Sequence, residues 1–188
     1  SLTTLHSHNN YQKQVNNMKV GICGKMASGK TTLAKGFNEE GFEIVSMADG
    51  VKRVGREVFG MTMKDRHLLQ QIGMKMREIR PTVWLDLLMK QADEVENAVC
   101  DDIRFVNEAT TLKENGWYLI KIDIDEELQK QRLMFTYPDH WESHWKNRHD
   151  PSEAEVDKIP LEIFDLVLSA EEGKSLFNLC RPTIKQNE

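Results

Sequence analysis

The sequence lacks the features that mark several classes of protein. It contains no apolar run close to the roughly 20 residues that a membrane-spanning helix needs, so we expect no membrane partner. Its formal net charge is −5, and it therefore lacks the basic excess of proteins that coat DNA or RNA. We expect no nucleic-acid partner. A small anionic ligand remains compatible with this charge, because it needs only a local basic pocket.

Cysteine is also scarce. The three residues, Cys23, Cys100 and Cys180, form an odd set without close spacing, which argues against a disulfide framework. We expect buried, reduced thiols and a cytoplasmic protein. Residues 1–17 are polar and lack the apolar segment of a secretion signal, so we interpret them as a flexible N-terminal arm or a cloning remnant. Residues 18–188 are expected to form a single domain.

Short apolar runs alternate with helical patterns along this domain. The candidate strands cover 19–23, 42–47, 97–103, 117–124 and 164–169. Helical spacing of apolar residues lies between them, while 136–150 looks irregular. This alternation predicts an α/β fold with a mostly parallel five-stranded sheet and helices on both faces.

The most specific motif follows the first candidate strand. GKMASGKT at 24–31 matches G-x-x-x-x-G-K-[ST], so we expect a three-layer sandwich of the P-loop NTPase type with a small lid. Glycines allow a tight turn, and the helix that begins near Lys30 directs free N–H groups at the same point. Lys30 is expected to reach the β- and γ-phosphates, and the Thr31 hydroxyl to ligate Mg²⁺. The predicted nucleotide-binding residues are Gly24, Ala27, Ser28, Gly29, Lys30, Thr31 and Thr32.

A P-loop enzyme also needs a carboxylate near Mg²⁺, at the end of a neighbouring strand. Asp101 and Asp102 follow an apolar run and fit that place. Adjacent strand residues point to opposite faces, so we expect only one of them to serve. The alternative is a solvated turn with two surface acids.

Nine arginines follow the phosphate loop, and no guanine-reading N-K-x-D motif is present. In an acidic chain some should gather where phosphates converge, although each could instead lie on a solvated helix face. A monophosphate acceptor is mostly dianionic and needs no general base, whereas a hydroxyl acceptor benefits from one. Arg77 and Arg80 lie one helical turn apart and could grip an acceptor phosphate. Arg132 and Arg148 are expected to act catalytically from a mobile lid at about 132–150.

Several segments together resemble the phage and viral deoxynucleoside monophosphate kinases, which belong to the nucleoside-monophosphate kinase-like P-loop enzymes. After the phosphate loop, SMADGVKRVGREVFGM at 46–61 resembles S-F-A-[DE]-x-x-K. DDIRFVNEA at 101–109 is similar to D-V-R-F-x-N-E-A. The segment 68–88, between these two, and the segment 148–169, after them, match in the family's order. The last one has one extra residue in its H-x-S-E pattern. The similarity spans about 19–180.

The resemblance implies ATP as donor, Mg²⁺ as cofactor, a (deoxy)nucleoside monophosphate as acceptor and a diphosphate as product, in the host cytoplasm if the source is viral. It aligns Asp102 with the acid of D-V-R, so Asp102 and Thr31 are the expected metal ligands. Trp84 is expected to stack on the acceptor base, with a buried core position as the alternative. The acceptor-binding residues, mostly in a helical region at about 48–94, are expected to be Asp49, Lys52, Arg77, Arg80, Trp84, Arg104 and Glu153.

Two alternatives stay open. A dephospho-coenzyme A kinase would share the phosphate loop and the short chain, and would use Asp49 as the base for a hydroxyl acceptor. A non-catalytic ATP-binding regulator would share the phosphate loop alone, and the number of arginines argues against this alternative. The sequence leaves open the preferred base and sugar and the oligomeric state, with a homodimer as one option.

Overall fold

The computed structural model describes residues 17–170, 177, 178 and 180. The chain divides into two compact units. One unit contains the chain up to Ile44 and from Asn97 onward, and the other is Val45–Glu96.

The first unit is built on a five-stranded sheet in the order β2-β3-β1-β4-β5. Every pairing in it is parallel. The carboxyl ends of the strands therefore share one edge, and β1 occupies the centre. The strands are β1 (Lys19–Gly24), β2 (Glu43–Ile44), β3 (Ala98–Ile103), β4 (Tyr118–Asp123) and β5 (Leu166–Ser169).

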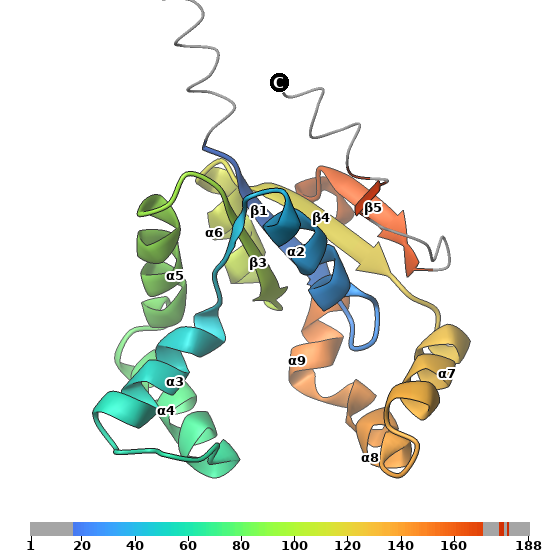
Figure 1. Ribbon diagram of the computed structural model, residues 1–188, viewed down its shortest axis with the longest axis horizontal. Coiled ribbons are helices and arrows are strands. Elements are labelled where there is room, and N and C mark those ends of the chain that lie inside the picture. The colour runs from blue at the N-terminus through green and yellow to red at the C-terminus, as the bar shows by residue number, and fades with distance from the viewer. Residues whose placement is uncertain (1–16, 171–176, 179, 181–188) are drawn as a thin grey trace, which may run out of the picture. The chain divides into compact units, whose positions relative to one another are not determined.

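Helices cover both faces of this sheet. Figure 1 shows α2 (Lys30–Glu39) in front of the strands and α6 (Val106–Glu114) behind them. The β1-to-β2 and β3-to-β4 crossovers run in opposite directions, so right-handed connections place their helices on opposite faces. The predicted three-layer α/β fold is confirmed. The chain continues through α7 (Glu126–Thr136), α8 (Trp141–Lys146), η1 (Asn147–His149), α9 (Pro151–Ala154), η2 (Glu155–Lys158) and η3 (Leu161–Ile163).

The core between α2 and the sheet is centred on Phe37. This side chain is fully buried and makes edge-to-face contacts with Phe42 and Phe177, at centroid distances of 5.1 and 5.3 Å. Val20 and Ile122 pack against the same cluster from β1 and β4. These contacts pack α2 against the central strand of the sheet.

The second unit contains three helices, α3 (Met47–Glu57), α4 (Arg66–Ile79) and α5 (Val83–Asp93). Ser46 Oγ and Asp65 Oδ1 cap α3 and α4 by accepting main-chain N–H groups of Ala48 and Leu68. The α3 and α5 helices pack so closely that a Cβ added at Gly50 would lie 2.7 Å from the Leu87 side chain.

Two segments differ from the sequence prediction. A strand over 42–47 was expected, but β2 has only two residues, because the Ser46 cap starts α3 at Met47. The segment 136–150 was expected to be irregular, yet it contains α8, which buries no residue and so gives no apolar periodicity. Among the described residues, all three cysteines are buried free thiols, and none of the helices has the length and apolar character to cross a bilayer.

Candidate active site

The phosphate loop, 24–31, connects β1 to α2 in a backbone path that requires glycine. A Cβ added at Gly24 would lie 2.6 Å from Ser28 Oγ and 3.0 Å from the carbonyl oxygen of Ile122. Gly29 has a φ of 102°, which L side chains rarely adopt. Ala27 also has a positive φ, 64°, so the loop holds a strained non-glycine residue at its tip.

The N-terminus of α2 is open to an anion. Its N-cap, Gly29, supplies no side-chain hydrogen bond, and the first turn contains no acidic residue. Ser28 Oγ, at the same point, is buried and has no hydrogen-bond partner in the described part of the chain. Free helix N–H groups and an unpaired buried hydroxyl are the donors that a bound phosphate would satisfy.

Lys30 is a largely buried cation inside the loop. Its Nζ donates a hydrogen bond to the carbonyl oxygen of Gly24. Burial, and then the nearby charge of Arg104, lower the pKa of Lys30, while Glu153 and Asp101 act in the opposite direction. Two cations and two carboxylates therefore meet at the carboxyl edge of the sheet.

The two adjacent acids of β3 have different surroundings. The Asp101 carboxylate receives a hydrogen bond from the Thr31 side chain. Burial and the neighbouring Asp102 charge raise the pKa of Asp101, and Lys30 opposes that rise. Asp102 instead accepts a hydrogen bond from Cys100 Sγ at 3.0 Å, on the other face of the strand. The structure thus brings Asp101 to Thr31, whereas the metal-ligand role of Asp102 stays a prediction.

Arg104 lies just after β3 and is fixed at both ends. Its main-chain N–H donates to Glu108 Oε2 at 2.9 Å, and the N–H of Phe105 donates to the same oxygen. Glu108 therefore caps α6. The guanidinium Nη1 of Arg104 lies 3.4 Å from Glu153 Oε1. Arg104 and Glu153, both predicted to bind the acceptor, therefore lie beside the phosphate loop.

Side chains of α7 hold the tip of the loop. Arg132 Nη1 donates to the Ala27 carbonyl at 3.0 Å, and its Nη2 donates to the Ala170 carbonyl at 2.9 Å. Gln129 Nε2 donates to the Met26 carbonyl at 3.0 Å, and this side chain is almost fully buried. Sequence reasoning missed Gln129, because a lone glutamine on a polar helix carries no signal of such a distant contact.

The second predicted lid arginine, Arg148, is held within its own segment. Its guanidinium lies 4.2 Å from the centroid of the Trp145 ring, and Nη1 donates to the Trp145 carbonyl. Lys130 Nζ lies 5.6 Å from the Trp141 ring centroid and 6.0 Å from that of Trp145. These cation–π contacts join α8 to α7 and account for both tryptophans. The catalytic role of Arg148 stays a prediction.

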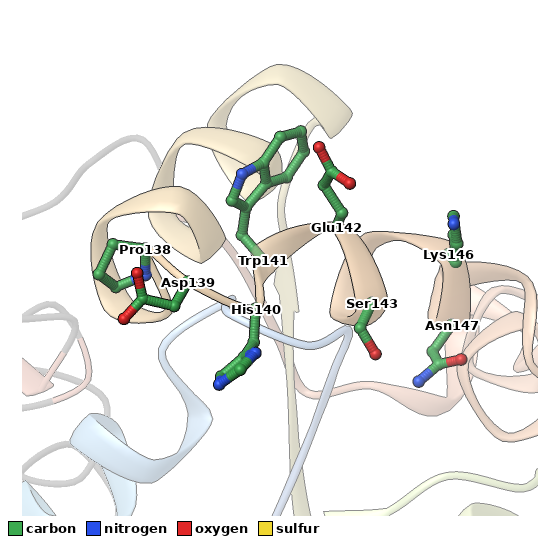
Figure 2. A pocket seen from close by; sticks show the side chains of 8 residues that line it. All are labelled: Pro138, Asp139, His140, Trp141, Glu142, Ser143, Lys146 and Asn147. Atoms are coloured by element: carbon green, nitrogen blue, oxygen red, sulfur yellow. The ribbon is translucent and has the colours of Figure 1, made fainter.

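A pocket of about 560 Å³ lies on the same segment, and none of its lining residues comes from the phosphate loop. Figure 2 shows His140, Ser143 and Asn147 on one side of α8, with Trp141 and Glu142 directed the other way. The pocket is lined by Pro138, Asp139, His140, Trp141, Glu142, Ser143, Lys146 and Asn147.

The other predicted acceptor residues belong to the Val45–Glu96 unit. Asp49, in the first turn of α3, pairs with Lys52 at 3.8 Å, and both side chains are exposed. Arg80 Nε lies 2.7 Å from Asp86 Oδ2. Arg77 lies in the last turn of α4. Their roles in binding stay predictions.

Trp84 is 2% exposed, and its indole N–H donates to the Gly73 carbonyl at 3.1 Å. This contact ties α5 to α4. The buried position is the alternative that the sequence left open for Trp84, and stacking on a base would require the ring to leave it.

The residues at the loop fit a phosphate group and Mg²⁺. The orphaned Ser28 Oγ and the uncapped α2 N-terminus fit an anion. The Thr31 hydroxyl and the Asp101 carboxylate, already joined by a hydrogen bond, are oxygen ligands of the kind that Mg²⁺ takes.

Comparison with known proteins gives a consistent picture, although no family model matches the chain. A protein of Acanthamoeba polyphaga mimivirus, described as "Putative deoxynucleotide monophosphate kinase", is 30% identical over 142 residues, 55% of this chain and 72% of its own length. A gluconokinase from Sinorhizobium meliloti has a similar structure, with 13% identity, a TM-score of 0.56 and 92% of each chain covered. A dephospho-CoA kinase from Campylobacter jejuni has 20% identity and a TM-score of 0.51, over 90% of this chain and 98% of its own.

The two solved structures share the fold with this chain, and the viral relative is similar to it in sequence. With the open phosphate loop, the partly buried lysine and the acid beside Thr31, these findings place the chain in the nucleoside monophosphate kinase-like family of P-loop kinases.

Proposed function

We propose that the protein transfers the γ-phosphate of ATP to the phosphate of a (deoxy)nucleoside 5′-monophosphate and releases the diphosphate. The observation that carries this proposal is the position of Arg104. Its charge acts on Lys30, so a second cation lies beside the one that the loop supplies to the donor. Two mutually repelling anions need such a pair, whereas a hydroxyl acceptor does not. The mimivirus relative supports the same acceptor class.

In this proposal, the main-chain and side-chain groups of the site have the following roles. The loop N–H groups and Lys30 hold the donor phosphates, for which Lys30 Nζ must leave the Gly24 carbonyl. Thr31 and Asp101 would hold Mg²⁺, which neutralises phosphate charge when bound. Arg104 holds the acceptor phosphate near the donor. Because the acceptor is already an anion, no side chain has to remove a proton from it.

A hydroxyl acceptor is the alternative, as in a dephospho-coenzyme A kinase. It would require Asp49 as a general base, and the exposed Asp49 carboxylate forms a loose pair with Lys52. Viral origin, the host cytoplasm and the absence of nucleic-acid and membrane partners belong to our proposal, which leaves a homodimer open.

The proposal is tested by mixing the protein with Mg-ATP and a panel of ribo- and deoxyribonucleoside monophosphates plus dephospho-coenzyme A, and following ADP formation. We expect ADP formation that depends on at least one nucleotide. Turnover with dephospho-coenzyme A alone would contradict the proposal, and the absence of acceptor-dependent ADP formation with every compound would favour a regulator. Lys30→Ala is the inactive control.

Asp49→Asn separates the two acceptor classes in the same assay. We expect nucleotide phosphorylation to stay within a few-fold of the wild type. A loss of about 10²–10⁴-fold would indicate a general base and revive the hydroxyl acceptor.

A further inference from the structure

The tip of the phosphate loop is held by residues that follow it by more than 100 positions in the chain. Both polar main-chain groups of Met26 are occupied: its carbonyl accepts from Gln129, and its N–H donates to Glu153 Oε2 at 2.8 Å. Glu153 belongs to α9, which Figure 1 places beside the loop between β1 and α2. The acid therefore contacts the donor side of the site.

The Glu153 carboxylate has a second partner. Its other oxygen, Oε1, lies 3.4 Å from Arg104 Nη1, and the residue as a whole is 7% exposed. A buried carboxylate is costly unless it is paired, and here one main-chain N–H and one guanidinium pair it. A single side chain thus connects the phosphate loop to the arginine after β3.

The charge of Glu153 also balances its surroundings. Lys30 and Arg104 repel each other, and Glu153 opposes the effect of Arg104 on the pKa of Lys30. Without a counter-charge, the flexible Arg104 side chain, which is 40% exposed, would gain by moving toward solvent. The carboxylate keeps two like charges close together before a phosphate is bound.

We propose that Glu153 is a positioning residue that holds the Arg104 guanidinium beside Lys30 and fixes the loop tip through Met26, rather than a residue that touches the acceptor. This inference rests on the proposed phosphoryl transfer. Glu153 acts through Arg104. Without the Glu153 charge, the guanidinium can still pair with the acceptor phosphate but is no longer fixed beside the donor phosphates, so the transfer step should slow more than binding of the acceptor weakens.

A double-mutant cycle tests this coupling. Glu153→Gln keeps an oxygen for the Met26 N–H but loses the charge that holds Arg104, and Arg104→Lys removes the fork that Glu153 orients. We expect Glu153→Gln to lower kcat about tenfold or more, with a smaller change in KM for the monophosphate. In the Arg104→Lys background, Glu153→Gln should lower kcat by a further factor of less than about three.

Three results would overturn the inference. Additive effects of the two substitutions would mean that Glu153 does not act through Arg104. A higher KM for the acceptor with unchanged kcat would mean that Glu153 supports binding of the acceptor, directly or through Arg104, and not the alignment of the transfer. Arg104→Lys tests the same contact by changing the arginine, and it leaves the contacts of the phosphate loop in place. An unchanged kcat in Arg104→Lys therefore overturns the inference even if Glu153→Gln fails to fold.

Asp157→Asn is the matched control. Asp157 also pairs with the loop, at 2.7 Å from Lys25 Nζ, but this pair is largely exposed. We expect its kcat to stay within about twofold of the wild type, as for most exposed ion pairs. A comparable loss in Asp157→Asn would contradict a specific role for Glu153. If the wild type shows no acceptor-dependent transfer, the proposed function is wrong. If the wild type is active but the effects of the two substitutions are additive, only the inference about Glu153 is wrong.

Discussion

Replacing Gly24 by alanine is expected to damage the phosphate loop more than the fold. The new Cβ would lie 2.6 Å from Ser28 Oγ, 3.0 Å from the Ile122 carbonyl and 3.3 Å from Lys30 Cγ. The two side chains can adjust, but the Ile122 carbonyl belongs to β4, whose register pairs Ile122 with Gly24. The loop must therefore move. Overpacking of this kind costs about 1–3 kcal/mol of the free energy of unfolding, and each kcal/mol lowers Tm by about 2–4 °C in a domain of this size.

The larger effect should fall on nucleotide binding. A shift of the loop moves the N–H groups away from the phosphate, so we expect the Kd for ATP to rise at least about tenfold, or about 1.4 kcal/mol. Urea unfolding followed by tryptophan fluorescence gives the stability, and calorimetric titration gives the Kd.

Gly41→Ala is the control for this experiment. Gly41 has a φ of 94° with no atom within 4 Å of an added Cβ, so its substitution strains the backbone by about 1–2 kcal/mol, away from the loop. Its Kd for ATP should equal that of the wild type. Wild-type affinity in Gly24→Ala, or equal weakening in both variants, would refute the steric argument.

Three further results are expected. Phe37→Ala should lower the free energy of unfolding by about 3–5 kcal/mol in urea titrations, because it empties the centre of the core; a loss below about 1 kcal/mol would contradict that packing. Burial and then Arg104 lower the pKa of Lys30, so between its folded and unfolded pKa values the unfolded chain keeps a proton that the folded chain has lost, and the contribution of Lys30 to stability rises with pH up to about 10.4. The buried cysteine thiols, whose pKa values are raised, act in the opposite direction, so the measurement is the difference in the free energy of unfolding between the wild type and Lys30→Met. This difference should move in favour of the wild type as the pH rises, and a difference independent of pH would contradict the argument. Asp101→Asn should raise the Mg²⁺ concentration for half-maximal activity about 10–100-fold, and the reverse order, with Asp102→Asn the more harmful, would favour the assignment made from the sequence.

The fold was largely accessible from the sequence, because its signals are local. A β-branched run, a glycine-rich turn and a helical pattern follow one another within 19–40, and the alternation repeats along the chain. The extent of β2 was not accessible, since one serine cap decides whether Ser46 ends a strand or begins a helix. The position of α8 depends on cation–π contacts to Lys130, which leave no apolar period.

The site was accessible in part, for the same physical reason. The loop residues are contiguous, so a motif identifies them. The contacts of Gln129, Arg132 and Glu153 with the loop join positions more than 100 residues apart, and only the folded chain brings them together. The choice between Asp101 and Asp102 depends on which face of β3 each side chain occupies. A pattern match specifies the order of residues but not that face.

The nature of the bond that the enzyme forms tests the central claim most directly. Deoxynucleoside monophosphates and dephospho-coenzyme A are mixed in equal amounts with Mg-ATP and the wild-type protein, and the products are followed by phosphorus NMR. ADP forms from ATP with either acceptor, so the signals that decide are those of the acceptors. We predict that the deoxynucleoside monophosphate signals give way to phosphoanhydride signals of deoxynucleoside diphosphates, in addition to those of ADP, and that Lys30→Ala does not produce them. A new phosphate monoester on dephospho-coenzyme A, with the deoxynucleoside monophosphates unchanged, would contradict the account and assign the enzyme a hydroxyl acceptor.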